Sequence, residues 1–194
     1  MFSCSIVYAQ AKSGVENYNF LSRGQKHVWM PVLHYETRQG VYAELRYNYE
    51  DVQTLSIFGG KTIRGSKSLI YVITPMVGFS IGKFTGFSLA ANTEFEWSKF
   101  YLSCQSQYSI ATEKNTPSFF FNWSEIGYNL SPTFFAGLAM QYTGERNMSD
   151  MKPGLMMGLN FNNFSLPCYF FKPFGLESFF IVALNFECNF KKRK

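Results

Sequence analysis

The sequence predicts an all-β fold: an antiparallel up-and-down transmembrane β-barrel of about twelve strands, with ten strands as the alternative. Long segments alternate between apolar and polar residues with a period of two, which is typical of strands that have one apolar face. Charged residues make up only 16% of the 194 residues, below the ~25% of a typical soluble domain. Connections in the second half of the chain alternate between tight turns and longer polar loops, as in barrels that span a bilayer.

The last predicted strand, residues 178–190, shows the alternation most clearly. One side of the extended chain carries Phe180, Val182, Leu184, Phe186, Cys188 and Phe190. The other side carries Ala183, Asn185, Glu187 and Asn189. A tilted strand needs about 9 to 11 residues to cross the hydrocarbon core of a bilayer, so this segment is long enough. No run of the sequence approaches the roughly 18 consecutive apolar residues of a transmembrane helix, and a closed barrel is the other architecture that satisfies the backbone in lipid.

The remaining strands follow from the same alternation and from the turn residues between them. Residues 28–37 and 41–50 form the clearest hairpin, with Gly40 in the turn. Asn162 and Asn163 suit the left-handed backbone of another tight hairpin. The predicted strands are residues 28–37, 41–50, 54–63, 68–82, 87–97, 100–110, 118–128, 133–143, 154–161, 164–172 and 178–190.

Three features modify this pattern. Residues 64–67 and 144–153 are polar and are predicted to be loops. Pro75 predicts a bulge or bend inside its strand, because proline cannot donate a hydrogen bond to a ladder. Bacterial single-chain barrels close with an even number of strands, so the weaker alternation around Tyr18 is expected to supply a twelfth.

The chain divides into four segments. Residues 1–11 are interpreted as the remnant of a secretory signal peptide, with small residues before a cut after Ala11. Residues 12–27 form an N-terminal segment with the weak first strand, residues 28–190 form the barrel, and residues 191–194 form a basic tail. Four of the +5 formal charges lie in that tail. The body is therefore close to neutral, which argues against a nucleic-acid-binding surface.

A long alternating strand that ends on an aromatic residue near the close of the chain resembles the last strand of bacterial outer-membrane β-barrels. The hairpin-rich layout of residues 28–190 is similar to that of uncharacterised porin-like members of this group. The basic tail departs from the pattern, because such chains usually stop at or near the terminal aromatic residue. The resemblance implies a location in the outer membrane of a Gram-negative bacterium, in contact with its lipid, rather than a particular activity.

The alternation alone does not decide which face meets water. A soluble lipocalin-like β-barrel that binds an apolar ligand has the same period with its apolar face inside. Here the polar face consists mostly of Ser, Asn, Gln, Thr and Tyr with scattered Glu, which suits a narrow wet interior better than an outer wall. Aromatic residues near strand ends are expected to form girdles at the two membrane surfaces. They are Trp29, Tyr35, Tyr47, Tyr49, Trp97, Phe100, Tyr108, Trp123, Tyr142 and Phe190.

Charged residues on the polar face are the candidate functional residues. They are expected to line the lumen, where charges either set the ion preference of a pore or pair across a narrow barrel and close it. The candidates are Glu36, Glu44, Arg46, Glu50, Glu94, Glu96 and Glu187.

No catalytic, cofactor-binding or metal-binding residue is predicted. The four cysteines lack CxxC spacing and nearby histidine partners, and Cys104, Cys168 and Cys188 are expected to face lipid as small apolar residues. His34 lies on the polar face beside Glu36 and is the base that a barrel-embedded lipid-modifying enzyme would use, but nothing marks a partner serine.

The sequence therefore favours an outer-membrane barrel without enzymatic activity, either a small porin-like channel for small solutes or a structural surface barrel. The soluble lipocalin-like carrier and the lipid-modifying enzyme are the alternatives. The identity of any solute, the openness of the lumen and the oligomeric state stay open at this point.

Overall fold

The computed structural model describes residues 11–66, 69–146, 148–175 and 177–190. Residues 1–10 of the predicted signal remnant 1–11 and the basic tail 191–194 lie outside the described residues, and Ala11 is the first residue of β1. Strands make up almost all of the described chain, and no helix in it is long and apolar enough to cross a membrane. The strands are β1 (Ala11–Ser22), β2 (Val28–Glu36), β3 (Val41–Tyr47), β4 (Thr54–Lys61), β5 (Ile63–Ser66), β6 (Ile70–Gly82), β7 (Gly86–Trp97), β8 (Phe100–Ala111), β9 (Phe119–Asn129), β10 (Phe134–Glu145), β11 (Met148–Phe161), β12 (Phe164–Phe171) and β13 (Phe179–Phe190).

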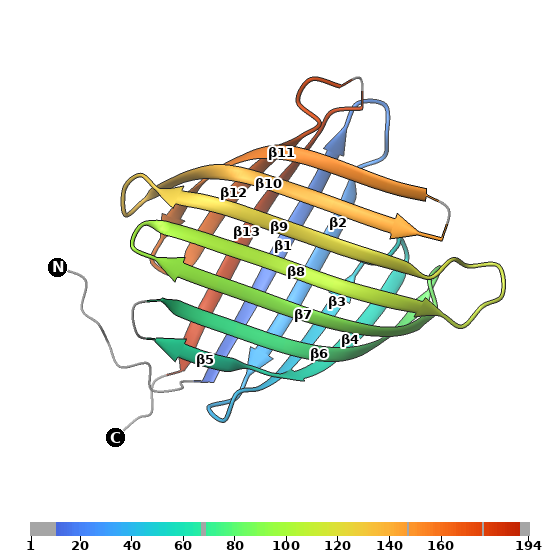
Figure 1. Cartoon of the computed structure of the whole chain (residues 1–194), viewed down its shortest axis with the longest axis horizontal. Helices are drawn as coiled ribbons and strands as arrows, with labels where there is room; N and C mark the ends of the chain where they lie inside the picture. Colours follow the sequence, from blue (N-terminus) through green and yellow to red (C-terminus); the bar gives the residue numbers. More distant parts are fainter. Residues whose placement is uncertain (1–10, 67–68, 147, 176, 191–194) are drawn as a thin grey trace.

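The strands form one antiparallel sheet that closes on itself (Figure 1). β1 pairs with β13 along its whole length, from Ala11 opposite Phe190 to Ser22 opposite Phe179. At the other end of the row β4 pairs with β6, so the described strands leave no long open edge. The weak alternation around Tyr18 thus marks a full strand. The prediction of an antiparallel barrel of about twelve strands is confirmed.

β4 and β5 act as one strand of the barrel wall. Gly60 faces Met76 and Ile63 faces Ile73 on β6, so the register continues unchanged from β4 to β5. In this register Pro75 lies opposite Lys61, and its missing N–H interrupts the ladder there. The described chain therefore has thirteen strand segments arranged as twelve strands around the barrel. The register of β6 with β7 is unbroken through Pro75, so the bulge predicted there does not form, and most of the loop predicted at residues 64–67 is strand instead.

Connections differ in length between the two ends of the barrel (Figure 1). The end that holds Ala11 and Phe190, called the turn end below, has the short connections 37–40, 98–99, 130–133 and 162–163. Ser98 and Asn162 have positive φ angles of 58° and 44°, as two-residue hairpin turns require. The opposite end, called the loop end, has the longer connections 23–27, 48–53, 112–118 and 172–178 together with the short connections 83–85 and 146–147.

The hairpin of β10 and β11 is longer than predicted. Its strands pair up to Glu145 opposite Met148, so residues 144–153 are mostly strand rather than loop. Backbone pairing between the two strands prevails over the polar character of this stretch, and Asp150 and Lys152 form an ion pair of 3.3 Å there. At the loop end β11 extends past its pairing with β12, which stops at Gly154 opposite Phe171, whereas β10 ends level with β9, with Glu145 opposite Phe119.

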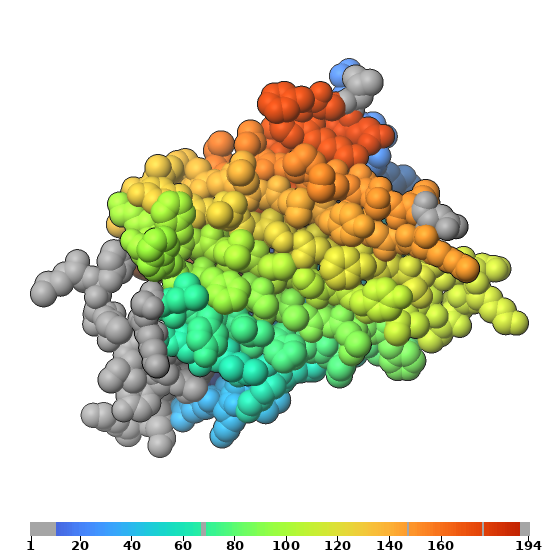
Figure 2. Space-filling view, viewed as in Figure 1, coloured from blue at the N-terminus to red at the C-terminus, as the bar shows by residue number. Residues whose placement is uncertain are grey.

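The outer wall is apolar. In β13, Val182 and Leu184 are 39% and 44% exposed, whereas Ile181 and Ala183 are each 1% exposed, so successive side chains face opposite sides of the sheet. Figure 2 shows the wall over β7 to β11 from outside as a surface closed by side chains. Large hydrophobic residues such as Val77 and Leu89 are about 60% exposed on this outer face, which is far more apolar exposure than a soluble barrel carries.

Aromatic residues near both ends of the outer wall are exposed, but two members of the expected girdles are not. Trp29, Trp97 and Tyr108 are exposed on the outer wall. Trp123 is buried inside the barrel, and Tyr49 packs against the same internal cluster. The expectation of a girdle position is therefore wrong for Trp123 and Tyr49.

Three polar side chains on the outer face, those of Cys104, Asn122 and Ser124, form hydrogen bonds with one another. Cys104, expected as a small apolar residue, accepts a hydrogen bond at its Sγ from Asn122 Nδ2 (3.0 Å), and its Sγ lies 3.4 Å from Ser124 Oγ. Ser124 Oγ donates to Asn122 Oδ1 at 2.7 Å. Cys104 lies two residues from exposed Leu102, and Ser124 lies two residues from exposed Ile126, so these side chains share the outer face. Their mutual pairing there lowers the cost of burying polar groups in an apolar medium.

The orientation of β13 makes a testable prediction about two adjacent residues. We expect Leu184→Arg to lower the free energy of unfolding by about 2–4 kcal/mol, because the charge is placed on the lipid-facing wall. Asn185→Arg places the same charge in an internal cavity and is expected to cost clearly less. The measurement is a urea titration of the protein folded into lipid vesicles. Equal costs for the two variants, or the reverse order, would contradict this orientation.

Candidate functional site

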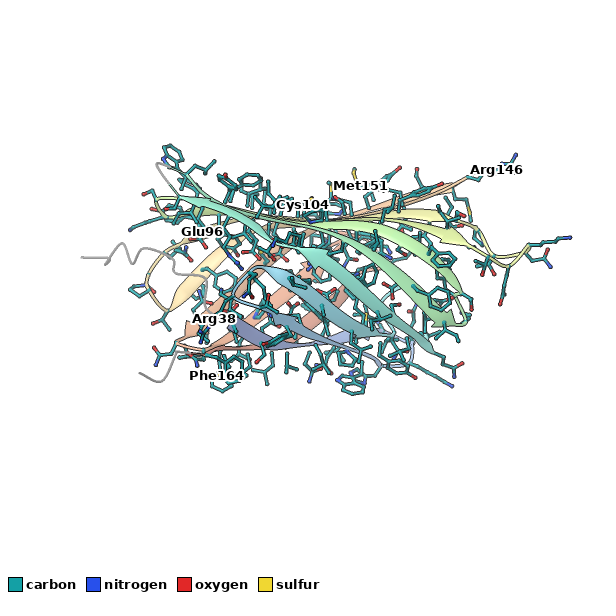
Figure 3. The ribbon with its side chains drawn as sticks, turned by 90° about the horizontal axis from the view of Figure 1, so that it is seen from below. Arg38, Glu96, Cys104, Arg146, Met151 and Phe164 are labelled. Carbon is teal, nitrogen blue, oxygen red and sulfur yellow. The ribbon has the colours of Figure 1, made fainter. Side chains whose placement is uncertain are left out.

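The interior of the barrel is the candidate site, because charged side chains of several strands meet there. Figure 3 shows side chains filling the space between the two walls, with Glu96 inside and Phe164 pointing away from the barrel. The sequence-predicted residues Glu36, Glu44, Arg46, Glu50, Glu94, Glu96 and Glu187 all take part in internal contacts or line internal cavities. The structure adds Lys12, Glu16, His34, Arg64 and Glu125 to this set.

Arg46 spans the interior. Its Nη1 donates to Gln107 Oε1 at 2.8 Å, and the two residues belong to β3 and β8, which are not neighbours in the sheet. Its Nε donates to Glu44, and Nη1 lies 3.5 Å from Glu50 Oε1. The Arg46 side chain is only 4% exposed. We refer to the contacts of Arg46 with Glu44, Glu50 and Gln107 as the Arg46 bridge.

Two rings and a turn hold the Arg46 bridge in place. The guanidinium carbon lies 4.6 Å from the centroid of the Tyr49 ring and 4.3 Å from that of Phe58, both cation–π distances. Asn48, with φ of 59°, lies just past the end of β3, and the chain turns inward after it. Tyr49 then donates to Gln105 on β8, and Glu50 accepts from Ser56. This turn is the reason that Tyr49 does not continue the outward alternation of β3.

Two further ion pairs lie nearer the turn end. Arg64 of β5 donates two hydrogen bonds to the carboxylate of Glu36 on β2. Lys12 Nζ on β1 lies 3.0 Å from Glu187 Oε1 on β13. Each basic side chain of this region is therefore matched to a glutamate.

His34 lies beside Glu16 rather than beside a nucleophile. Its Nδ1 is 3.6 Å from Glu16 Oε1, and its ring stacks on Tyr42 with centroids 6.0 Å apart. Gly14 makes room for this ring, since a Cβ there would lie 2.3 Å from two imidazole atoms. Within the described part of the chain His34 makes no hydrogen bond to a serine, so the geometry does not support the lipid-modifying enzyme.

Three of the interior glutamates lack an ion-pair partner in the described chain. Glu94 and Glu96 of β7 and Glu125 of β9 form no salt bridge with any described residue. All three line one internal cavity of about 300 Å³. The three acidic side chains of this cavity therefore have no ion-pair partner among the described residues.

Aromatic residues fill the part of the interior next to the loop end. Trp123 makes an edge contact with Tyr169, with ring centroids 5.1 Å apart, and Tyr169 stacks on Phe171 at 6.0 Å. Phe171 and Ile181 are at most 1% exposed. The expectation of a wet interior is wrong for this half, because β12 and β13 are apolar on both faces near the loop end.

The internal cavities fall into two groups on either side of the Arg46 bridge. The 300 Å³ cavity adjoins one of about 170 Å³ lined by Lys12, Glu16, His34 and Arg64, and the two share Glu94. We call these two together the turn-end cavity. A separate cavity of about 180 Å³ lies toward the loop end and is lined by Glu50, Gln107, Phe119 and Glu145, among others. The loop-end cavity and the turn-end cavity share no lining residue.

Sequence reasoning missed several interior residues for identifiable reasons. Arg64 was assigned to a loop. Glu125 lies on the same face of β9 as Trp123. Because Trp123 is expected in an outer girdle, the sequence assigns this face to the lipid side, whereas it faces the interior. Lys12 and Glu16 belong to the weak first strand. No group of three or more His, Cys, Asp or Glu residues in the described chain is arranged to hold a metal ion.

Comparisons with known proteins agree on the class of fold. No family model matches the sequence, and no curated protein matches it. Among solved structures, the KdgM porin has a TM-score of 0.66 at 8% identity, over 89% of this chain and 98% of that one. The NanC porin has a TM-score of 0.61 at 7% identity, over 92% of this chain and 100% of that one. A second KdgM structure is described as a complex with disordered oligogalacturonate. At these identities the likeness shows a shared porin-like barrel fold.

The buried Arg46 bridge makes a prediction about stability. We expect Arg46→Leu to lower the free energy of unfolding by about 3–5 kcal/mol, because Glu44 and Glu50 are left as buried charges without their partner. Adding Glu44→Gln and Glu50→Gln to the same chain is expected to recover much of this loss.

The control for this prediction is an exposed ion pair. Lys83 Nζ lies 3.2 Å from Asp51 Oδ1, and Lys83→Ala is expected to cost less than about 1 kcal/mol, because exposed pairs are weak. Urea unfolding in vesicles measures all three variants. A loss in Arg46→Leu no larger than that in Lys83→Ala would contradict the account of the Arg46 bridge.

Proposed function

We propose that this protein is a porin-like channel of the bacterial outer membrane that passes small solutes. The observation that carries the proposal is the turn-end cavity, a charged chamber enclosed by a closed barrel whose outer wall is apolar. A closed barrel is one of two architectures that satisfy every backbone group in hydrocarbon. The shared fold with the KdgM and NanC porins supports this choice.

The placement in the membrane follows from the connections. Short turns face the periplasm and longer loops face the outside in barrels of this kind, so we place the turn end on the periplasmic side. The export signal predicted for residues 1–11 belongs to this proposal, because an outer-membrane protein must leave the cytoplasm. The two aromatic-rich ends of the wall then meet the lipid head groups.

The size of the solute is limited by the Arg46 bridge. Gln107 and Arg46 meet across the interior at 2.8 Å, and aromatic side chains occupy much of the rest of that layer. The KdgM complex contains an oligosaccharide, and by that likeness small polar or sugar-like molecules are candidate solutes here. Passage through this chain requires the Arg46 bridge to separate, so we expect a small conductance.

Two other functions have less support. A soluble lipocalin-like carrier would bury its apolar face and display charges outside, whereas the exposed apolar residues here cover the outer wall. A purely structural surface barrel would have the same apolar outer wall and the same fold as a channel. It differs from a channel in conducting no ions, and the electrical measurement below separates the two.

Reconstitution in planar lipid bilayers tests the proposal. We expect discrete conductance steps from the purified barrel, and larger steps from Gln107→Ala, because that variant removes one side of the Arg46 bridge. Gln39→Ala, in an exposed turn outside the barrel, is the matched control and should leave the steps unchanged. An electrically silent, folded barrel would rule out transport and leave the structural role.

A further inference from the structure

We infer that the interior selects cations: small inorganic cations and protonated amines enter the turn-end cavity in preference to anions. This inference rests on the proposed channel function and names the class of solute that the channel favours. The formal charge of the whole chain is +5, so overall composition points in the opposite direction. The inference depends on which charges face the interior and which of them are already paired.

In the described chain, the charges that face the interior between the turn end and the Arg46 bridge are mostly negative. The basic side chains of this part are Lys12, Arg46 and Arg64, apart from His34. The acidic side chains that face it between the turn end and the Arg46 bridge are Glu16, Glu36, Glu44, Glu50, Glu94, Glu96, Glu125 and Glu187. The glutamates thus outnumber the fixed positive charges by more than two to one.

Each of these basic residues already forms an ion pair with a glutamate, so the charged side chains of the turn-end cavity that have no ion-pair partner in the described chain are all acidic. Lys12 pairs with Glu187, Arg64 with Glu36, and Arg46 with Glu44 and Glu50. An incoming anion would have to displace one of these carboxylates to find a positive partner. An incoming cation meets Glu94, Glu96 and Glu125, which have no basic partner among the described residues.

The geometry concentrates this charge on the path of a solute. Glu94 and Glu96 lie on β7 and Glu125 on β9, and all three face the same 300 Å³ cavity. Glu96 sits near the mouth at the turn end, within the barrel (Figure 3). Apolar walls of low dielectric focus the field of such a cluster and raise the local concentration of counter-ions. Acidic groups around a pore favour cations for this reason.

Neutral groups of the cavity add an independent observation. Asn92 Oδ1 and Asn185 Oδ1 are buried and have no hydrogen-bond partner among the described residues. Asn92 lines the 170 Å³ part of the turn-end cavity and Asn185 the 300 Å³ part. Both are acceptor oxygens, which bind cations or the N–H groups of a protonated amine. Charged and neutral groups of the turn-end cavity therefore favour the same class of solute.

Reversal potentials in planar bilayers test the inference. With a KCl gradient across the membrane, we expect the wild-type channel to show a permeability for K⁺ over Cl⁻ of about tenfold or more, the low end of the focusing effect of charged clefts. The triple variant Glu94→Gln, Glu96→Gln and Glu125→Gln keeps the side-chain volumes and is expected to move this ratio toward one. Glu113→Gln, in an exposed loop, removes one negative charge outside the barrel and should leave the ratio unchanged.

The outcomes separate the inference from the proposed function. A channel that conducts but prefers Cl⁻, or whose ratio is the same in the triple variant, overturns cation selection and leaves the channel intact. A silent wild-type barrel overturns both. Urea unfolding of the triple variant checks that it folds, and we expect no loss of stability, because the three substitutions remove unpaired like charges from one cavity.

Discussion

The pairing of β1 with β13 is the constraint on which the rest of the barrel depends. Lipid offers no hydrogen bonds, so every backbone N–H and C=O in the wall must find a partner in another strand. Ala11 opposite Phe190 and Ser22 opposite Phe179 close the ladder over its full length, even though the alternation of β1 is weak. Closure also fixes the inside of the molecule. Once the ring is complete, each strand has one face toward lipid and one toward a shared interior, and residues far apart in the sequence must meet there.

That shared interior is divided rather than uniform. Aromatic side chains such as Trp123 and Phe171 pack next to the loop end as in a soluble core, while charged side chains gather toward the turn end. The Arg46 bridge adjoins the aromatic cluster through Tyr49 and joins β3 to β8 through Gln107. A buried ion pair contributes little net stability by itself, since desolvation offsets the attraction. Its position across the lumen gives it a second consequence, because the same contacts that satisfy buried charges also narrow the route through the barrel.

Alternation along the strands predicts much of this architecture. It tells which face of a strand points to the interior only where the two faces differ in polarity. For β3, β7 and the turn-end half of β13 one face is apolar and the other polar, and the interior residues Glu44, Glu94 and Glu187 follow directly. In β9 and β12 both faces carry large apolar residues, so the period alone does not tell inside from outside. Trp123 was placed on the wrong face for this reason, and Glu125 was missed with it. Tyr49 was misplaced because a left-handed residue, Asn48, ends the strand and reverses the direction of the next side chains.

The sequence by itself determined the class of fold: strand-length segments, a period of two and few charged residues are local properties, and each requires only the geometry of an extended chain and the thickness of a bilayer. The tertiary structure decided which charges are paired. Arg46 meets Gln107, and Arg64 meets Glu36, only because closure and register bring their strands to those positions. Charge compensation depends on distances across the interior, which no spacing along the chain encodes. Glutamates that look alike in the sequence therefore differ in the folded barrel, where some form ion pairs and Glu94, Glu96 and Glu125 form none with a described residue.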